Sequence, residues 1–400
     1  MTQSEVVFEP FSKEFFENPY EVYRRMRDEA PVYYDSKEDF YALTRHADVA
    51  AAFKNHETFS STRGLDLATV RSNTPQVKSI IFMDPPEHRH MRSLLNKVFT
   101  PRAIEAQRAL VTEQIDRFLA AADPERFDVV QDFAAVFPME VITRMAGVPE
   151  ENAQEVRRWM DETWHREPGN PEMSEEAMQA FMKIGMYYFN LVQERRAEHR
   201  EDMITRLIEA EIPRANGEIS RLDDLEIAGF VTLLNGAGTE TVTKLIGNAI
   251  VVFAEHPEQW QMLLEDRSKI PRAVEELLRY VGPTQYLVRY SLKPLTLHGV
   301  TIPAEKPVFL INASANRDPR AWTDPDTFNI ERNPTEAQNL GFGYGIHSCL
   351  GAALARMETS IALNKLLDFM PRYEIDWSGS RRFNEPNLMG WSHLPVRVLK

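Results

Sequence analysis

The strongest constraint on the fold lies in residues 341–351, where glycines surround the only cysteine of the chain. Four of the 17 glycines fall within this short segment, together with Cys349. Because glycine has no Cβ atom, such a density indicates a backbone that turns tightly or lets a flat group come close. The run Ala352-Ala353-Leu354 that follows consists of good helix formers. The sequence therefore predicts a cysteine at a helix N-terminus, reached through a glycine loop.

A single cysteine narrows the available sulfur chemistry. It excludes an intrachain disulfide, a CxxC redox pair and every zinc or iron–sulfur site that needs several cysteines. At a helix N-terminus, free N–H groups and the helix dipole favour the thiolate over the thiol. Cys349 is therefore a candidate nucleophile or metal ligand. The alternative is a buried structural cysteine, which is the usual role of a lone cysteine.

The composition is that of an acidic globular protein. Hydrophobic residues make up 43% and charged residues 26% of the 400 residues, enough to build a large core. The net charge of −14 disfavours nucleic-acid binding, because phosphate neutralisation needs clustered lysine and arginine. The N-terminus lacks the regions of a signal peptide, and the charge-free stretch 227–239 is too short to span a bilayer. We expect a cytoplasmic protein without a membrane segment or a nucleic-acid partner.

The pattern along the chain predicts a mainly α fold with a small β-rich lobe. Helical periodicity dominates from about residue 87 to 255. The expected helices that carry motifs begin at Asp223 or Asp224 and reach about Ala254, span 271–280, and run from near Cys349 to near Phe369. The expected extended segments are 31–34, 40–43, parts of 284–311 and the tail 394–399. Residues 61–80 are expected to form a mobile loop.

The order of these elements limits the architecture. Strands do not alternate with helices, so a doubly wound parallel sheet is not expected. Length alone would allow two or three domains. The resemblance described next implies one domain over residues 1–400.

Residues 342–351 resemble the haem-binding loop FGxGxHxCxG of the cytochrome P450 family at every fixed position. The resemblance implies the cytochrome P450 fold and haem b as cofactor. It also implies that Cys349 is the thiolate ligand of the iron, where it favours O–O cleavage. His347 matches the position that reaches a haem propionate. The remaining loop positions that would line the haem are Phe342, Gly343 and Gly351.

The segment Glu276-Leu277-Leu278-Arg279 resembles the ExxR motif of the same family. Alone it says little, because opposite charges at i,i+3 on a helix usually form a solvated pair. The same spacing also begins at Glu21, Glu105, Glu155, Glu211 and Glu218. The instance at Glu276 is distinguished from the others by its position before the cysteine loop. The resemblance implies that Glu276 and Arg279 are buried and, with Arg332, hold the segment before the cysteine, which is a structural role.

Residues 237–241, Ala-Gly-Thr-Glu-Thr, lie inside the long helix and resemble the family's AGxxT element. The plain alternative is a helix-surface pair of Glu240 and Lys244 at i,i+4. Glycine is a poor residue inside a helix, so Gly236 and Gly238 are candidates to leave room for a small molecule. The resemblance implies that Thr241 hydrogen-bonds the oxygen being activated and that Glu240 helps to deliver protons. Ala237 would line both the haem and the substrate.

Three further cationic side chains are candidates to bind the haem propionates. His88 and Arg92, in a segment resembling the family's DPPxHxxxR element, are spaced i,i+4 and so share one helix face. Donors in that arrangement can clamp a carboxylate. Arg289 matches another propionate contact of the family. The alternative for His88 and Arg92 is an ordinary basic helix face.

The resemblance implies a monooxygenase that uses O2 to hydroxylate a hydrophobic small molecule. Electrons would come from NAD(P)H through a separate ferredoxin reductase and a ferredoxin, and the protein is expected to be a monomer. Ferredoxins are acidic, so docking on an acidic chain requires a local basic patch. The candidates for that patch are Arg92, Lys97, Arg102, Arg272 and Arg356.

Candidates for the substrate lining follow from their place in the chain. They are mostly apolar, which predicts a terpenoid, a steroid or a fatty acid. These residues are Leu233, Leu234, Ala237, Leu287, Val288 and Met389. The aromatic and Met-rich stretch 159–188 is expected to form either an adaptable lid or an ordinary packed helix pair.

Two other classes of function stay open on the residues. A haem-thiolate sensor or carrier would bind a ligand without turnover and would not need Glu240 and Thr241. A cysteine hydrolase would need a general base near the thiol. His347 stands only two residues from Cys349 and is a poor candidate for that base.

Overall fold

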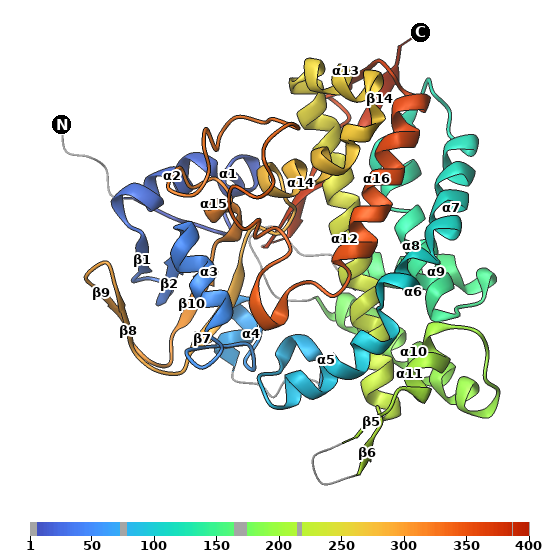
Figure 1. Cartoon of the computed structure of the whole chain (residues 1–400), viewed down its shortest axis with the longest axis horizontal. Coiled ribbons are helices and arrows are strands. Elements are labelled where there is room, and N and C mark those ends of the chain that lie inside the picture. Colours follow the sequence, from blue (N-terminus) through green and yellow to red (C-terminus); the bar gives the residue numbers. More distant parts are fainter. Residues whose placement is uncertain (1–5, 73–77, 164–173, 214–217, 386, 400) are drawn as a thin grey trace. The chain divides into compact units, whose positions relative to one another are not determined.

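The computed structural model describes residues 6–72, 78–163, 174–213, 218–385 and 387–399 (Figure 1). The chain packs into two compact units, each assembled from segments that are far apart in the sequence. The first unit comprises Met1–Gln76, Asn248–Cys349 and Arg381–Trp391, and the second comprises Val77–Gly247, Leu350–Ser380 and Ser392–Lys400. One domain over the whole chain stays a prediction.

The first unit combines a sheet with helices from two separate stretches of the chain, residues 13–72 and 257–347. Its elements are α1 (Lys13–Glu17), α2 (Tyr20–Glu29), β1 (Val32–Asp35), β2 (Phe40–Leu43), α3 (His46–Lys54), β3 (Phe59–Ser60), α4 (Leu67–Ser72), α13 (Pro257–Glu265), η3 (Arg267–Lys269), α14 (Ile270–Tyr280), β7 (Leu287–Ser291), β8 (Leu295–Leu297), β9 (Val300–Ile302), β10 (Pro307–Leu310), α15 (Asn312–Ala315), η4 (Gly345–His347), β12 (Arg381–Glu385) and most of β13 (Leu388–His393). The expected helix at 271–280 and the extended segments at 31–34, 40–43 and within 284–311 are confirmed.

The larger sheet has the strand order β1-β2-β10-β7-β3. Strand β10 runs parallel to β2 and antiparallel to β7. Because successive side chains of a strand point to opposite faces, Phe309 packs with Phe8 and Phe40 on one face while Val308 and Leu310 pack on the other. Both faces of the sheet are therefore buried in apolar clusters, which makes it a rigid support for β7 and its arginine.

The second unit is mainly helical. Its elements are η1 (Ile80–Phe82), α5 (Glu87–Val98), α6 (Pro101–Glu105), α7 (Arg108–Ala121), β4 (Phe127–Asp128), the π-helical turn η2 (Val129–Ala134), α8 (Phe137–Ala146), α9 (Glu150–Thr163), α10 (Glu175–Ala197), α11 (Met203–Glu209), β5 (Ile212–Pro213), β6 (Ile219–Ser220), most of α12 (Asp224–Glu255), α16 (Ala352–Phe369), β11 (Tyr373–Ile375) and β14 (Pro395–Val398). The expected long helix and the last helix are confirmed as α12 and α16.

Within the second unit, α7 and α16 lie side by side (Figure 1). An ion pair at their surface joins Lys365 Nζ to Asp116 Oδ1 at 2.7 Å. Strand β14, the expected extended tail, pairs with β4 and β11. These contacts tie the C-terminal segments to helices from the first half of the chain.

The expected loop at residues 61–80 is wrong in part, because residues 67–72 form helix α4. The Asp66 carboxylate accepts a hydrogen bond from the Thr69 N–H at 2.8 Å, as at a helix N-cap, and Leu67 and Val70 are buried. Of the expected lid, α9 and α10 are observed, and residues 164–173 lie outside the described residues. Among the helices described, none combines the length and the apolar character needed to cross a membrane.

Candidate functional site

The cysteine loop is closed by its own backbone. The N–H of Cys349 donates to the Phe342 carbonyl at 2.9 Å, and the N–H of Ser348 donates to the Gly345 carbonyl at 3.1 Å. The cysteine side chain is exposed, and α16 begins at Ala352, as the sequence predicts. The cysteine therefore stands three residues before the first residue of α16.

Two of the loop glycines are required by close contacts within the protein. A Cβ atom at Gly345, where φ is +75°, would lie 2.5 Å from the Phe53 carbonyl oxygen of α3. A Cβ atom at Gly341 would lie 2.7 Å from the Leu278 carbonyl oxygen of α14. Any side chain at either position would force the loop away from α3 or α14.

Gly343 differs from those two glycines. Its φ is +66°, and a Cβ atom there would meet only the His347 carbonyl oxygen, at 4.0 Å. The loop is therefore open beside Gly343 and carries an exposed thiol six residues later. An open glycine face next to an accessible cysteine fits a flat group with a metal at its centre, which is what a haem is.

A buried carboxylate and two arginines lie together beside the loop. Glu276 and Arg279 of α14 form a bidentate pair, with both N–O distances at 2.8 Å. Arg332 Nε lies 3.1 and 3.2 Å from the two Glu276 oxygens. Each side chain is at least nine-tenths buried. The structure thus brings together the three residues that the resemblance expects to be partners.

The arginines of this cluster connect α14 to the segment before the cysteine. Arg279 donates to the carbonyl oxygens of Asn316 at 2.9 Å and Pro325 at 2.8 Å. Asn339, at the entry of the loop, donates to the Glu275 carbonyl at 2.9 Å and accepts from the Gly341 N–H at 3.0 Å. Helix α14 therefore holds the loop entry through hydrogen bonds and through the close contact at Gly341.

Two candidate propionate ligands belong to the first unit. Arg289 lies on β7, is 4% exposed, and donates from its guanidinium to the Val288 carbonyl at 3.0 Å. Its guanidinium carbon lies 6.0 Å from the Phe53 ring centroid. His347 ends the short turn η4 and is half-buried. Phe53 thus lies close to two parts of the candidate site. Its ring faces the Arg289 guanidinium, and its carbonyl lies beside Gly345 of the loop.

The other two candidate propionate ligands lie on α5 in the second unit. His88 is buried and Arg92 is partly exposed, one helical turn later. The alternative of a plain basic helix face does not describe His88, because that side chain is only 3% exposed.

In the middle of helix α12, three accessible side chains form a stripe. Ala237 is exposed, and Leu233 and Thr241 are partly exposed, at i,i+4 spacing. The Thr241 hydroxyl donates to the Ala237 carbonyl at 2.9 Å. The stripe is the part of the helix that can face a ligand, and Thr241 is its polar position.

Glu240 and Lys244 do form the i,i+4 pair, but not at the surface. Lys244 Nζ lies 2.9 Å from Glu240 Oε2, and the side chains are 4% and 11% exposed. The surface interpretation of this pair is therefore wrong, because tertiary packing covers it. A buried ion pair gains little net stability, since both ions lose their hydration.

The expected space beside Gly238 is also wrong. A Cβ atom at Gly238 would lie 3.3 Å from Ile142 Cδ1 of α8, so a neighbouring side chain already fills that side of α12. Gly236 is buried as well. These glycines let α12 pack closely and do not provide a cavity.

The candidates for the substrate lining divide into accessible and buried side chains. Leu233, Ala237 and Leu287 are partly or fully accessible. Leu234 and Met389 are 8% and 7% exposed. Val288 is wrong as a lining residue, because it is fully buried in the cluster of Phe8 and Phe309, on the sheet face opposite Leu287.

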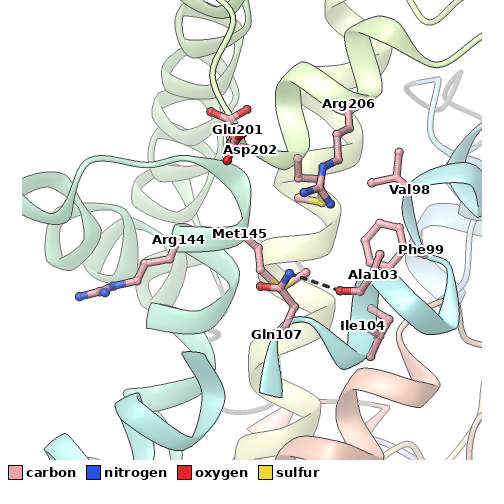
Figure 2. Close-up of a pocket in the computed structure, with 11 residues that line it drawn as sticks. Val98, Phe99, Ala103, Ile104, Gln107, Arg144, Met145, Glu201, Asp202 and Arg206 are labelled. Atoms are coloured by element: carbon pink, nitrogen blue, oxygen red, sulfur yellow. Dashed lines mark hydrogen bonds between the residues drawn. The ribbon is translucent and has the colours of Figure 1, made fainter. Parts of the chain in front are cut away.

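A small pocket in the second unit lies apart from these residues (Figure 2). The ends of α5, α6, α8 and α11 line it, with apolar side chains such as Phe99, Ile104 and Met145. Gln107 donates to the Ala103 carbonyl at 3.3 Å at its edge (Figure 2). Its volume of about 90 Å³ holds only a few water molecules. It contains none of the predicted site residues and is too small for a steroid.

The structure adds residues that the motifs did not indicate. Phe53 and Lys54 of α3 support the loop, with Lys54 Nζ 4.7 Å from the Tyr344 ring centroid. No local sequence signal marks these residues, because their roles depend on contacts between distant segments.

Comparisons with known proteins match nearly the whole chain. The cytochrome P450 family profile matches residues 6–376. Cytochrome P450 123 of Mycobacterium tuberculosis is 39% identical over 98% of this chain and 97% of its own length. Erythromycin C-12 hydroxylase of Saccharopolyspora erythraea is 34% identical over 93% of this chain and 92% of its own.

A solved structure shows the same fold. CYP109E1 from Bacillus megaterium, crystallised with corticosterone, superposes with a TM-score of 0.86 at 32% identity, covering 96% of this chain and all of that one. The fold is thus the cytochrome P450 fold, and the family's members are haem-dependent monooxygenases. On the match over nearly its whole length, the chain belongs to the cytochrome P450 family.

Proposed function

We propose that this chain hydroxylates a hydrophobic small molecule and that Cys349 would bind the iron of its haem as a thiolate. The observation that carries the proposal is the exposed Cys349 thiol, which ends a loop that is open beside Gly343. When bound, the haem activates O2, and thiolate ligation favours O–O cleavage. The Glu276 cluster supports this assignment, because it holds the loop entry in a defined position.

The proposed site residues form two groups. The first would bind the haem, and the second would donate hydrogen bonds or protons to the reactants. His88, Arg92, Arg289 and His347 would bind the two propionates, since cationic donors form strong hydrogen bonds with carboxylates. The Thr241 hydroxyl can turn from the Ala237 carbonyl to donate to a reactant above the stripe. Glu240 is an ionisable group next to that hydroxyl, suited to hand over the protons that the reaction consumes.

The substrate we propose is a largely apolar molecule of steroid size. Leu233 and Ala237 support this, because they give the accessible stripe of α12 an apolar surface. Solved structures of the similar CYP109E1 contain corticosterone and testosterone. The similar P450BioI was solved with a fatty-acid-loaded acyl carrier protein, so a fatty acid is the second candidate, ahead of a terpenoid.

Electrons would arrive from NAD(P)H through a ferredoxin reductase and a ferredoxin, as is typical of the bacterial cytochrome P450s that this chain resembles. The monomeric state and the cytoplasmic location stay predictions.

The decisive measurement is the spectrum of the reduced, haem-loaded protein with carbon monoxide. We expect a strongly red-shifted Soret band that is lost in Cys349→Ala and kept in Ser348→Ala, the neighbouring control. An unshifted band in the wild-type protein would contradict thiolate ligation. Testosterone, palmitic acid and a monoterpene alcohol are then titrated as probes. A blue shift of the Soret band with testosterone alone supports the steroid class, and a response only to another probe overturns it.

A further inference from the structure

The outward face of α10, in the second unit, carries an apolar stripe. Four large apolar side chains of this one helix are between 42% and 62% exposed: Met178, Phe181, Met182 and Met186. The other methionines that the structure describes are buried or only partly exposed. A contiguous apolar patch that water would otherwise cover is typical of a surface that meets a partner.

The stripe is the middle of a longer line of side chains, which we call the α10 seam. Its members are exposed or partly exposed and follow one another at intervals of three or four residues: Glu175, Met178, Met182, Met186, Phe189, Gln193 and Arg196. Such intervals keep them on one face of the helix, and they are the intervals by which one helix packs along another. The opposite face of α10, with Ala180, Ile184 and Leu191, is buried within the protein. The α10 seam is therefore the face left for a partner helix.

The centre of the α10 seam fits a second copy of the same helix that runs in the opposite direction. With a twofold axis between Gly185 and Met186, the Met186 side chain of each copy lies over Gly185 of the other. A Cβ atom at Gly185 would meet no protein atom within 4 Å, so there is room for that side chain. Methionine is unbranched and flexible, which suits it to fill such a space. A large side chain opposite a glycine is the knob-into-hole contact of packed helices.

The pairs of residues on either side of the axis are complementary as well. Met182 lies opposite Phe189, and a thioether beside an aromatic ring is a favourable contact. Farther out, Glu175 in the first turn of α10 lies opposite Arg196 in the last turn, so opposite charges meet at both ends. Arg196 also contacts Asp224 of its own protomer, and its side chain is still 37% exposed. A parallel pair of helices would instead place each of these charges beside its own copy.

We propose that the α10 seam is a self-association surface, through which two copies of this chain form an antiparallel twofold pair. In a twofold pair each surface meets itself, so the contact requires a line of residues that is complementary to its own reverse. A seam along one helix is small beside the roughly 20–30 residues per side of a stable interface. The pair is therefore weak and reversible, with a Kd on the order of ten micromolar. At lower concentrations the chain is the monomer predicted from its sequence.

Sedimentation equilibrium of the haem-loaded full chain, from about 1 to about 200 µM, tests the association. We expect the average mass to rise with concentration toward that of two chains. Met182→Glu places a charge in the middle of the seam and should raise the Kd at least about tenfold. The matched control is Ile219→Glu, which changes an exposed apolar residue of β6 in the same unit and should behave as wild type.

Disulfide cross-linking with oxidised glutathione tests the direction of the pair. In the antiparallel arrangement the two copies of residue 186 lie beside the axis, whereas the two copies of residue 178 lie about 22 Å apart along the helices. A disulfide needs two Cα atoms within about 7 Å. Met186→Cys should therefore form a cross-linked dimer, and Met178→Cys should not. The wild type, whose only cysteine is Cys349, is the control and should stay uncrosslinked.

Each other outcome overturns the proposal. A wild type that stays monomeric over the whole concentration range has no self-association surface. Equal weakening by Met182→Glu and Ile219→Glu would show that net charge, and not the seam, governs association. Cross-linking of both cysteine variants, or of Met178→Cys alone, or of neither, would contradict an antiparallel pair centred at Gly185. Circular dichroism and the carbon monoxide spectrum of each variant exclude misfolding as the cause of a lost association.

Discussion

At the scale of single residues, the environment of a side chain affects its protonation state more than its chemical type does. Glu358, in the middle of α16, looks like any helical glutamate in the sequence, yet it is 1% exposed. Burial raises its pKa well above the usual range, and among the described residues its Oε1 atom has no hydrogen-bond partner. The residue therefore favours the protonated acid in the folded protein.

This burial makes stability depend on pH in a defined direction. Above the unfolded pKa of about 4.5, the unfolded chain releases the proton that the folded protein keeps, so the wild type loses stability relative to Glu358→Gln. The expected slope is about 1.4 kcal/mol per pH unit, and it ends at the folded pKa. Denaturant unfolding at several pH values measures it. A difference between the two proteins that does not vary with pH would refute the burial argument.

At the scale of elements, the same sequence spacing gives a buried ion pair in one helix and an exposed ion pair in another. Glu276 with Arg279 and Glu105 with Arg108 share the Glu-x-x-Arg spacing and form an ion pair in both cases. The first pair is at least 97% buried, whereas more than half of each side chain in the second is exposed. Only the first can hold a loop, because only there is the charge surrounded by protein groups.

The two glutamates therefore make a matched pair of variants. Glu276→Gln leaves Arg279 and Arg332 buried beside a neutral amide and should cost about 3–5 kcal/mol of unfolding free energy, with loss of haem retention. Glu105→Gln should change neither, because a solvated pair contributes little. Unfolding curves and the haem-to-protein absorbance ratio give the comparison. Equal effects of the two substitutions would contradict a structural role for the Glu276 cluster.

Glycines offer a second comparison at this scale. Gly345→Ala would place a methyl group 2.5 Å from the Phe53 carbonyl at a positive φ, so we expect loop distortion and poor haem binding. Gly185→Ala, within α10, meets no atom within 4 Å and should stabilise the protein by about 0.5–1 kcal/mol. Thermal unfolding and haem titration distinguish the two. Normal haem binding by Gly345→Ala would show that α3 does not support the loop.

At the scale of the whole molecule, charge governs the encounter with a redox partner. The net charge of −14 would repel the acidic ferredoxin proposed as partner, so its docking would depend on local cations. Lys97 and Arg102 are exposed on α5 and α6, and Arg92 and Arg356 are partly exposed in the same unit. Arg272, the fifth candidate, belongs to the first unit and is exposed on α14.

Reversing Lys97 and Arg102 to glutamate should slow reduction by ferredoxin and weaken the dependence of its rate on salt, because steering between opposite charges is screened by ions. Lys183→Glu, on the exposed side of α10 in the same unit, controls for net charge. Stopped-flow reduction at several ionic strengths measures both effects. A salt dependence that matches the wild type would exclude these two residues from the docking surface.

The sequence by itself determined the family, the helices α12, α14 and α16, and the identity of the cysteine, since these depend on local spacing and on a long motif. Tertiary structure decided what each polar group does. It buried Glu240 with Lys244, filled the side of Gly238 with Ile142 and turned Val288 into the core. The physical reason is that burial and electrostatic neighbours are set by contacts between segments far apart in the chain, and local patterns do not contain that information.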